Sequence, residues 1–301
     1  MSFPFEYDHG APLAFGGTLP HPKSFEDSRV VILPVPVDRT TSYVPGTRNG
    51  PREILQASSH MELWDEELGV DVHSVGLFTL PEMELPFGEL EPLMDEIRRV
   101  AAEIFSRDKF LVTLGGEHSI TPPLVAAAAA RYPGLHVLQI DAHADLRDRY
   151  MGTPYNHACA IRRSLEHAPA TQVGIRSMST EEAQAAPRLN TTIFYDHSMR
   201  QDPAWVERVV ESLGDPVYIT IDVDAMDPAI MPATGTPEPG GLSWYEMLTL
   251  LRGAIAGRNV VALDVVELSP LPGLMAPNFL CAKLIYKMLG YKFGNSLKSA
   301  R

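Results

Sequence analysis

Short β-branched and apolar runs alternate along the chain with longer segments of helical periodicity. The short runs have the length and composition of buried strands and cover residues 30–33, 71–75, 110–114, 136–140, 171–175, 191–195, 217–221 and 260–266. The longer segments repeat apolar residues at helical spacing or open with a proline, and they cover residues 51–66, 90–107, 122–132, 244–257 and 276–289. Strands that alternate with helices predict parallel strands joined by helical crossovers, and therefore an α/β fold.

This pattern alone leaves two architectures open. About eight strands suit either a doubly wound open sheet or a (β/α)₈ barrel, and both place their chemistry at the carboxyl ends of the strands. Residues 1–28 lack the periodicity and are rich in Pro and Gly. We therefore expect an N-terminal arm over residues 1–28, packed on a single domain of residues 29–301 or on a neighbouring subunit.

The charge and cysteine content narrow the classes of partner. The 301 residues include 38 acidic and 25 basic side chains, a formal net charge of −13. Such a charge argues against nucleic acid and favours cationic small molecules or divalent metals. Two cysteines, Cys159 and Cys281, predict core thiols in a reducing compartment. Without a basic leader or a long apolar run, the sequence predicts a cytoplasmic protein and no membrane partner.

Three of the predicted strands run directly into residue types that bind metals. Alternate side chains of extended backbone share a face, so each short motif presents its ligands together. The candidate ligands are His118, Asp141, His143, Asp145, Asp222 and Asp224. Four carboxylates balance two divalent cations, and carboxylate with imidazole but no thiolate favours Mn²⁺, with Zn²⁺ and Co²⁺ as alternatives. Two metals that share a water would generate a hydroxide nucleophile, so the residues predict metal-assisted hydrolysis.

These segments resemble the ureohydrolase family of arginases and agmatinases. The resemblance covers about residues 29–290 and is carried, in order and spacing, by LGGEHS (114–119), DAHADLRD (141–148), TIDVDAMDPAIMPATGTPEPGGLS (220–243) and VVELSP (265–270). Residues 36–54 are similar to the family's N-terminal loop, although Asp38-Arg39-Thr40 lacks a glycine often found there. The resemblance implies a three-layer α/β/α fold around a mostly parallel, eight-stranded sheet, which favours the open sheet over the barrel.

The resemblance also implies a reaction and roles for individual residues. The six candidate ligands would hold two Mn²⁺ ions, and a bridging hydroxide would attack a guanidinium carbon to give urea and an amine. Asp145 would hold that hydroxide and pass its proton to the leaving nitrogen. His157 matches a pocket histidine proposed to shuttle protons, and Glu267 matches the carboxylate that pairs with the substrate guanidinium. Thr236 and Asn156 are further expected substrate contacts, and the family assembles into trimers or hexamers.

The residues after the D-x-H-x-D motif bear on the substrate's tail. Arginase-like members clasp the α-carboxylate of arginine there, often with an asparagine, whereas this chain has Arg147. Glu238 and Pro239 also follow agmatinases more than arginases. We therefore expect agmatine, a small dication, cleaved to urea and putrescine. Arginine, guanidinobutyrate and other ω-guanidino compounds are alternatives, and a non-catalytic relative or a metal-dependent deacetylase stands outside the family activity.

Overall fold

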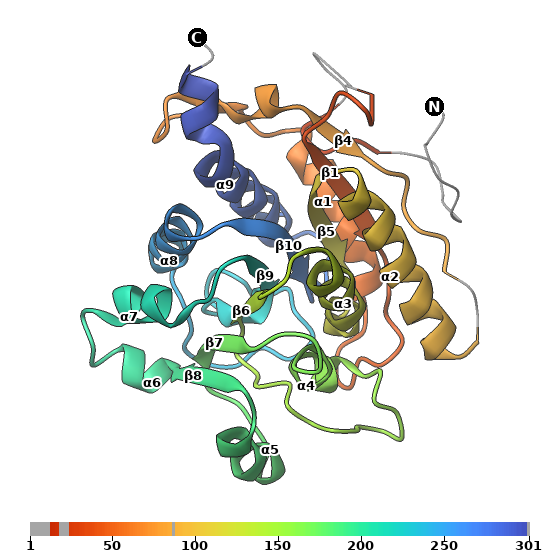
Figure 1. Cartoon of the computed structure of the whole chain (residues 1–301), viewed down its shortest axis with the longest axis vertical. Coiled ribbons are helices and arrows are strands. Elements are labelled where there is room, and N and C mark those ends of the chain that lie inside the picture. Colours follow the sequence, from red (N-terminus) through yellow and green to blue (C-terminus); the bar gives the residue numbers. More distant parts are fainter. Residues whose placement is uncertain (1–12, 18–23, 86–87, 300–301) are drawn as a thin grey trace.

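One parallel sheet crosses the middle of the protein in a computed structural model that describes residues 13–17, 24–85 and 88–299 (Figure 1). Its strands are β1 (Val30–Val35), β4 (Leu77–Thr79), β5 (Phe110–Gly115), β6 (His136–Ile140), β7 (Ala170–Ile175), β8 (Thr191–Tyr195), β9 (Val217–Asp222) and β10 (Val260–Val266). They are ordered β4-β1-β5-β10-β9-β6-β7-β8, and every neighbouring pair is parallel. Because β4 and β8 lie at opposite edges, the sheet is open and the barrel alternative is wrong.

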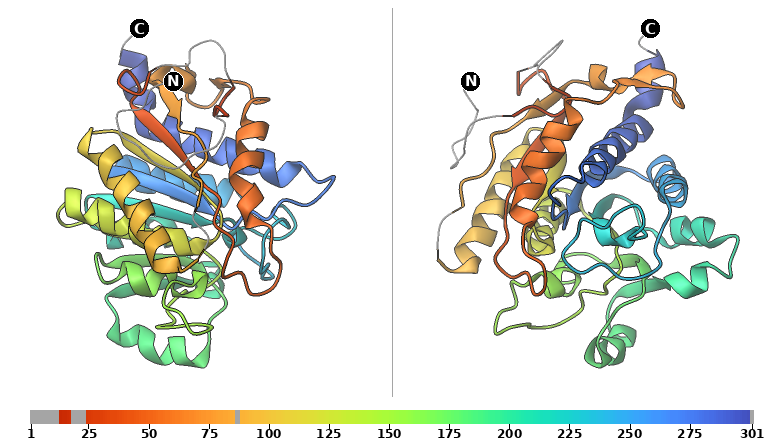
Figure 2. Two further views of the ribbon diagram at one scale, coloured as in Figure 1. Left: turned by 90° about the vertical axis from the view of Figure 1, so that its right-hand side faces the viewer. Right: turned by 180° about the vertical axis from the view of Figure 1, so that it is seen from behind.

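Helices cover both faces of the sheet and make three layers (Figure 2). The helices are α1 (Gly50–Ser58), α2 (Leu90–Ser106), α3 (Thr121–Arg131), α4 (Ala160–Ser164), α5 (Thr180–Ala185), α6 (Asp196–Met199), α7 (Trp205–Ser212), α8 (Trp244–Gly257) and α9 (Ala276–Ser299). Apolar side chains of α1, α7, α8 and α9 form one core with one face of the sheet, and those of α2, α3 and α4 form a second core with the other. Along β1, Val30 and Ile32 belong to the first core and Val31 and Leu33 to the second. Successive side chains of the strand therefore pack into opposite layers. The predicted three-layer α/β/α fold is confirmed.

Three predicted elements differ from the structure. Residues 71–75 are not a sheet strand: Val70–Asp71 pairs with Trp64–Asp65 in an antiparallel pair of short strands, β3 and β2, and Val72–Val75 forms a 3₁₀ turn. The Asp71 side chain accepts a hydrogen bond from the backbone N–H of His73 and so favours the turn over the strand. The helix expected over 51–66 ends at Ser58, and the helix expected over 276–289 continues to Ser299. The short strand β4, which was not predicted, forms one edge of the sheet.

The described part of residues 1–28 packs against the sheet domain, and the rest lies outside the described residues. Phe15 and Phe25 are buried, and the backbone N–H of Phe15 donates to Thr79 Oγ1. Both cysteines are buried free thiols, as expected. Within the described ranges, no helix is long and apolar enough to cross a membrane.

Candidate metal centre and active site

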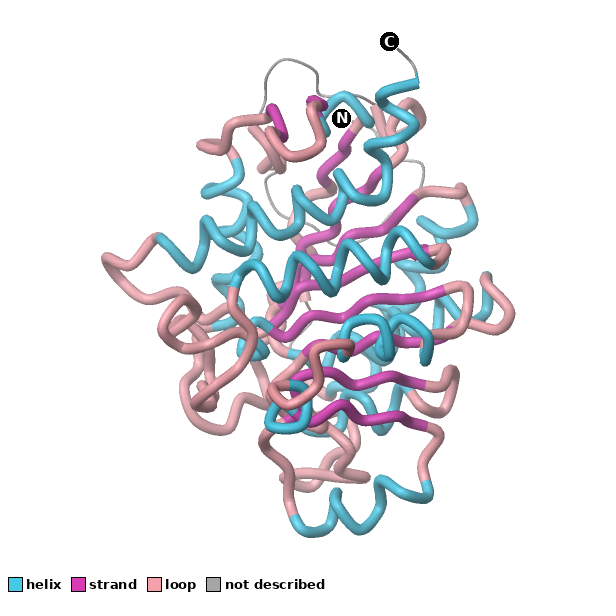
Figure 3. The backbone as a smooth tube through the Cα atoms, turned by 90° about the vertical axis from the view of Figure 1, so that its left-hand side faces the viewer, coloured by secondary structure: helices cyan, strands magenta, loops and turns pink. Residues whose placement is uncertain are grey.

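Most of the long connections of the fold leave the carboxyl ends of the strands, whereas the connections that enter the strands are short except for the one before β4 (Figure 3). The loops after β5, β6, β9 and β10 carry the motifs singled out in the sequence. These four strands are consecutive in the sheet, in the order β5-β10-β9-β6. The strand order therefore brings segments more than a hundred residues apart to one edge.

Two glycines at the end of β5 allow neighbouring segments to pack closely against the chain. A Cβ on Gly116 would lie 1.9 Å from the carbonyl oxygen of Val37, and a Cβ on Gly115 would lie 2.5 Å from Val266 Cγ1. Only glycine fits where backbone segments approach this closely. The glycines of LGGEHS thus allow Glu117 and His118 to sit fully buried between β1 and β10.

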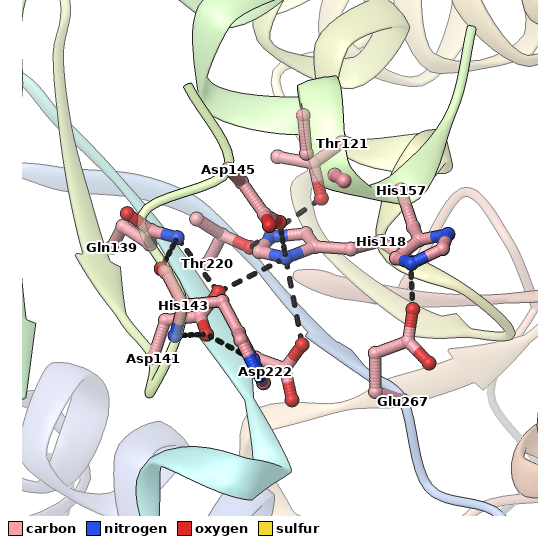
Figure 4. Close-up of polar contacts among 12 residues, drawn as sticks. His118, Thr121, Gln139, Asp141, His143, Asp145, His157, Thr220, Asp222 and Glu267 are labelled. Atoms are coloured by element: carbon pink, nitrogen blue, oxygen red, sulfur yellow. Dashed lines mark hydrogen bonds and ion pairs between the residues drawn. The ribbon is translucent and has the colours of Figure 1, made fainter. Parts of the chain in front are cut away.

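His118 is surrounded by carboxylates from two other strands (Figure 4). Its Nδ1 atom lies 3.0 Å from Asp145 Oδ2 and 3.2 Å from Asp141 Oδ2. A third carboxylate oxygen, Asp222 Oδ2, lies 3.6 Å from the same nitrogen. His118, Asp141 and Asp145 have ligand atoms close enough to share one cation.

A second group of ligands adjoins the first. His143 Nδ1 lies 2.9 Å from Asp224 Oδ2 and 3.7 Å from Asp141 Oδ1. Asp141, His143 and Asp224 again have ligand atoms close enough to hold a cation. Asp141 belongs to both groups, one oxygen facing each. The structure therefore brings all six sequence-predicted ligands together, as two sites joined by one carboxylate.

Hydrogen bonding behind His118 shows that this cluster suits a cation. His118 Nε2 lies 2.9 Å from Thr220 Oγ1, which in turn donates to Asp264 Oδ1 at 2.6 Å. Asp264 also accepts hydrogen bonds from Thr121 and Tyr218, so its carboxylate anchors the whole chain of contacts. With Nε2 as the donor, Nδ1 carries the lone pair. That buried atom has no hydrogen-bond partner among the described residues and faces three carboxylates, which a cation between them would stabilise.

The titration of these groups points the same way. Burial and the Asp224 charge raise the pKa of Asp141 to about 7, and burial with the Asp224 charge raises the pKa of Asp222 well above its usual range. Burial would lower the pKa of His118, but the Asp141 and Asp145 carboxylates outweigh it and hold this pKa well above normal. The protein groups alone therefore take up protons to relieve their repulsion, a role that divalent cations fill in metal sites of this composition.

Two residues of the expected site adopt strained backbone. Asp145 has φ of 50° and Glu267 has φ of 66°, and they are two of only four non-glycine residues with positive φ in the described ranges. Such conformations cost on the order of 1–3 kcal/mol and persist where the surroundings hold them. Glu267 is held by its backbone N–H, which donates to the Gly116 carbonyl, and by its Oε1, which accepts from the N–H of His118 at 2.7 Å.

A cavity of about 270 Å³ opens beside the ligands. Asp145, His157, Thr236 and Glu267 all line it, together with His143 and Asp222 on its inner side. Asn156 does not reach this cavity. It is buried, its Oδ1 accepts from the N–H of Ala158, and it lines a neighbouring cavity beside α2 and α3.

Comparison with known proteins agrees with this geometry. Residues 28–290 match the model of the Arginase family. The chain belongs to the arginase family. It is 38% identical over 276 residues to the N(1)-aminopropylagmatine ureohydrolase of Synechocystis sp. (89% of this chain, 90% of the relative) and 37% identical over 255 residues to the agmatinase of Bacillus cereus (83% and 86%). The crystal structure of the agmatine ureohydrolase of Thermoplasma volcanium aligns with a TM-score of 0.84 and 31% identity, covering 92% of this chain and 94% of that one. The resemblance stated from the motifs is confirmed.

Two residues that line this arginase-family cavity, Tyr150 and Glu182, were not predicted from the sequence. Arg147 stacks over the Tyr150 ring at 4.5 Å, and its Nε lies 3.7 Å from Glu182 Oε2. Glu182 is buried and completes a capping box with Ser179 at the start of α5. The S-x-x-E spacing signalled that cap, but nothing in it pointed to a cavity.

Proposed function

We propose that this protein is an agmatine-cleaving ureohydrolase, which hydrolyses the guanidinium group of an amine-tailed guanidine to urea and an amine. The observation that carries the proposal is the pair of ligand groups sharing Asp141, next to the buried Glu267 carboxylate at the base of the cavity. Membership of the arginase family and relatives named for this chemistry support it.

The ligand groups suit two Mn²⁺ ions, because carboxylate and imidazole donors without thiolate favour that metal, with Zn²⁺ or Co²⁺ as alternatives. His118, Asp141, Asp145 and Asp222 would hold one ion, and Asp141, His143 and Asp224 the other. When bound, the ions supply Lewis acidity and a water of lowered pKa.

Glu267 orients the substrate in this proposal. Burial, together with the nearby Glu117 charge, raises the pKa of the Glu267 carboxyl well above its usual range. A planar guanidinium returns the carboxylate to its ionised form and can bond it bidentately, which fixes the carbon to be attacked. Asp145 then carries a proton to the leaving nitrogen, and His157 exchanges protons with the solvent side of the cavity.

The mouth of the cavity favours a cationic tail. The Arg147 guanidinium is already paired with Glu182 and stacked on Tyr150, so it is poorly available to grip a carboxylate. Glu238 adds a carboxylate beside the cavity, its Oε1 3.8 Å from Nε2 of His143, which lines the cavity. This carboxylate attracts the protonated amine of agmatine, whereas the paired Arg147 is not free to bind the α-carboxylate of arginine.

N(1)-aminopropylagmatine is a second candidate substrate. The relatives with that name, from Synechocystis and from Thermus thermophilus, match 89% of this chain, more than the 83% matched by the Bacillus cereus agmatinase. Its longer tail carries an additional amine, which would extend past the Glu238 carboxylate.

Urea release decides between these substrates. Purified protein, stripped of metal and reloaded with Mn²⁺, is given agmatine, N(1)-aminopropylagmatine, arginine and guanidinobutyrate at equal concentrations. We expect urea from the amine-tailed guanidines, abolished in Asp141→Ala protein and strongly reduced in Glu267→Gln protein, with exposed Glu211→Gln as the matched control. Urea chiefly from arginine would overturn the tail assignment. No urea from any of them, with two metals bound per chain, would favour a non-catalytic relative or a deacetylase.

The sequence and the family resemblance also support a proposal for the quaternary structure and the cellular location. We propose a cytoplasmic homo-oligomer of three or six subunits, each with residues 1–28 as an arm on a single domain of residues 29–301. Light scattering of the purified protein measures the subunit number, and a monomer would contradict the proposal.

A further inference from the structure

A fully buried carboxylate, which the proposed reaction does not use, lies behind the cavity. Glu117 Oε2 accepts hydrogen bonds from the backbone N–H groups of Arg39 and Thr40, both at 2.7 Å. Its Oε1 accepts from Thr40 Oγ1 at 2.9 Å and from Ser119 Oγ at 2.6 Å. Each oxygen thus receives two donors, so an ionised carboxylate, which only accepts, satisfies the site and an amide would not.

The same threonine touches His157 at two points. Thr40 Oγ1 accepts a hydrogen bond from the backbone N–H of His157 at 3.0 Å and lies 3.2 Å from its ring atom Nδ1. Thr40 is itself buried, whereas His157 is half-buried and lines the cavity. The contact joins a loop after β1 to the turn that follows the D-x-H-x-D segment, 117 residues away.

Hydrogen counting assigns the form of the imidazole. A hydroxyl has one hydrogen and two lone pairs. The Thr40 hydrogen goes to Glu117, and one lone pair receives the backbone N–H of His157. The remaining lone pair faces Nδ1, so Nδ1 must carry a hydrogen and donate it. In the neutral ring, Nε2 then keeps its lone pair, because only one ring nitrogen is protonated.

We propose that Thr40 and Glu117 are positioning residues that hold the neutral His157 imidazole as its Nδ1–H tautomer, leaving Nε2 to accept and return protons in the cavity. The use of Nε2 rests on the proposed function, whereas the tautomer rests on the hydrogen bonds alone. Tyr150 supports the ring from another side, with its ring edge-on to the imidazole at a centroid distance of 6.4 Å.

The tautomer can be measured without turnover. The full-length protein, labelled with ¹⁵N-histidine and loaded with diamagnetic Mg²⁺, gives ring-nitrogen shifts that distinguish the two neutral tautomers, and His157→Gln protein assigns the signal. We expect protonated Nδ1 and unprotonated Nε2 in wild-type and Thr40→Ser protein, and loss of this preference in Thr40→Val protein. Thr41→Val is the matched control, because Thr41 Oγ1 donates to Asp38 and not to the histidine. A wild-type signal with protonated Nε2 would overturn the proposal even if no variant folds.

Kinetics then test what the tautomer contributes. We expect Thr40→Val to lower kcat by roughly 10- to 100-fold, part of the 10²–10⁴ that a general acid or base supplies, with little change in KM. Thr40→Ser should restore kcat to within about threefold, and Thr40→Val should have no further effect in a His157→Gln background. An unchanged kcat in Thr40→Val protein with an altered tautomer would refute the role of Nε2. Absence of any guanidine hydrolysis, with the expected tautomer, would refute the proposed function and leave the positioning role intact.

Discussion

Arg176, in the loop after β7, holds two stretches of the long connection between β9 and α8, and its removal should destabilise that connection. Its Nη2 donates to the carbonyl oxygens of Asp224 at 2.7 Å and Glu238 at 3.0 Å, and its Nε donates to that of Pro239 at 3.1 Å. The guanidinium thus joins the start of this connection to the later stretch that carries Glu238. Gly241 leaves room for it, because a Cβ there would lie 2.8 Å from Arg176 Nη2.

The size of the effect follows from these bonds. Arg176→Met leaves three well-formed hydrogen bonds unmade, each contributing about 1 kcal/mol, so the free energy of unfolding should fall by about 3 kcal/mol. In a chain of this size, each kcal/mol shifts Tm by about 2 °C, which predicts a decrease of about 6 °C. Because Asp224 is a proposed ligand held by the same guanidinium, the affinity for Mn²⁺ should also fall.

Thermal unfolding, followed by circular dichroism with and without saturating Mn²⁺, measures this effect. Arg208→Met is the matched control, because exposed Arg208 forms an ion pair with Asp202 at the surface. Its loss should lower the free energy of unfolding by less than about 1 kcal/mol. Arg176→Met protein that melts within 1 °C of the control, in both conditions, would refute the reasoning.

Three further predictions concern buried charge. Asp264→Asn should weaken Mn²⁺ binding by about 10- to 100-fold, because it removes the negative charge behind the His118 ring. Competition with a chelating dye measures the affinity, and an affinity equal to that of the wild type would contradict the prediction. The free energy of unfolding of metal-stripped protein should fall as the pH rises from about 4 to about 7. The reason is that the folded-state pKa of Asp141, about 7, lies above its ordinary 3.8, so the folded state binds an extra proton over this range. Chemical denaturation at several pH values measures the slope, and the opposite slope would contradict this. Lys287→Met should lower the free energy of unfolding by about 3–5 kcal/mol, because it leaves the fully buried Asp65 carboxylate, 3.0 Å from the Lys287 amine, without its cationic partner. Denaturant titrations measure this, and a loss smaller than about 1 kcal/mol would contradict it.

Local pattern was enough to predict the strands that carry the ligands and most of the helices. The segments HVLQI and VYITI are apolar and β-branched, and each ends at an aspartate, so both the strand and the position of its polar end could be predicted. The short run of residues 71–75 was misleading, because its two valines suit a strand while the Asp71 side chain caps a turn. Short helices such as α5 and α7 contain too few residues for the period to be distinctive.

The spacing of ligands within one motif was likewise fixed by the sequence. Asp141 and His143 lie two residues apart, as do Asp222 and Asp224, which keeps each pair at the end of one strand. The extended backbone expected for Asp222 and Asp224 is wrong, because Val223–Ala225 forms a 3₁₀ turn and the Asp222 side chain accepts a hydrogen bond from the N–H of Asp224. Which motifs face each other was decided by the order of strands in the sheet, where β10 and β9 lie between β5 and β6.

The links between distant loops were decided by tertiary structure alone. Arg176 on three carbonyls of the β9–α8 connection, and Thr40 between Glu117 and His157, leave no trace in local periodicity. Periodicity records which side of an element is buried, whereas these contacts depend on how the crossovers order the strands and on which backbone groups are left to be satisfied at their ends. The residue types and spacings thus determined what chemistry this chain can carry, and the packing of the loops determined how each group is held.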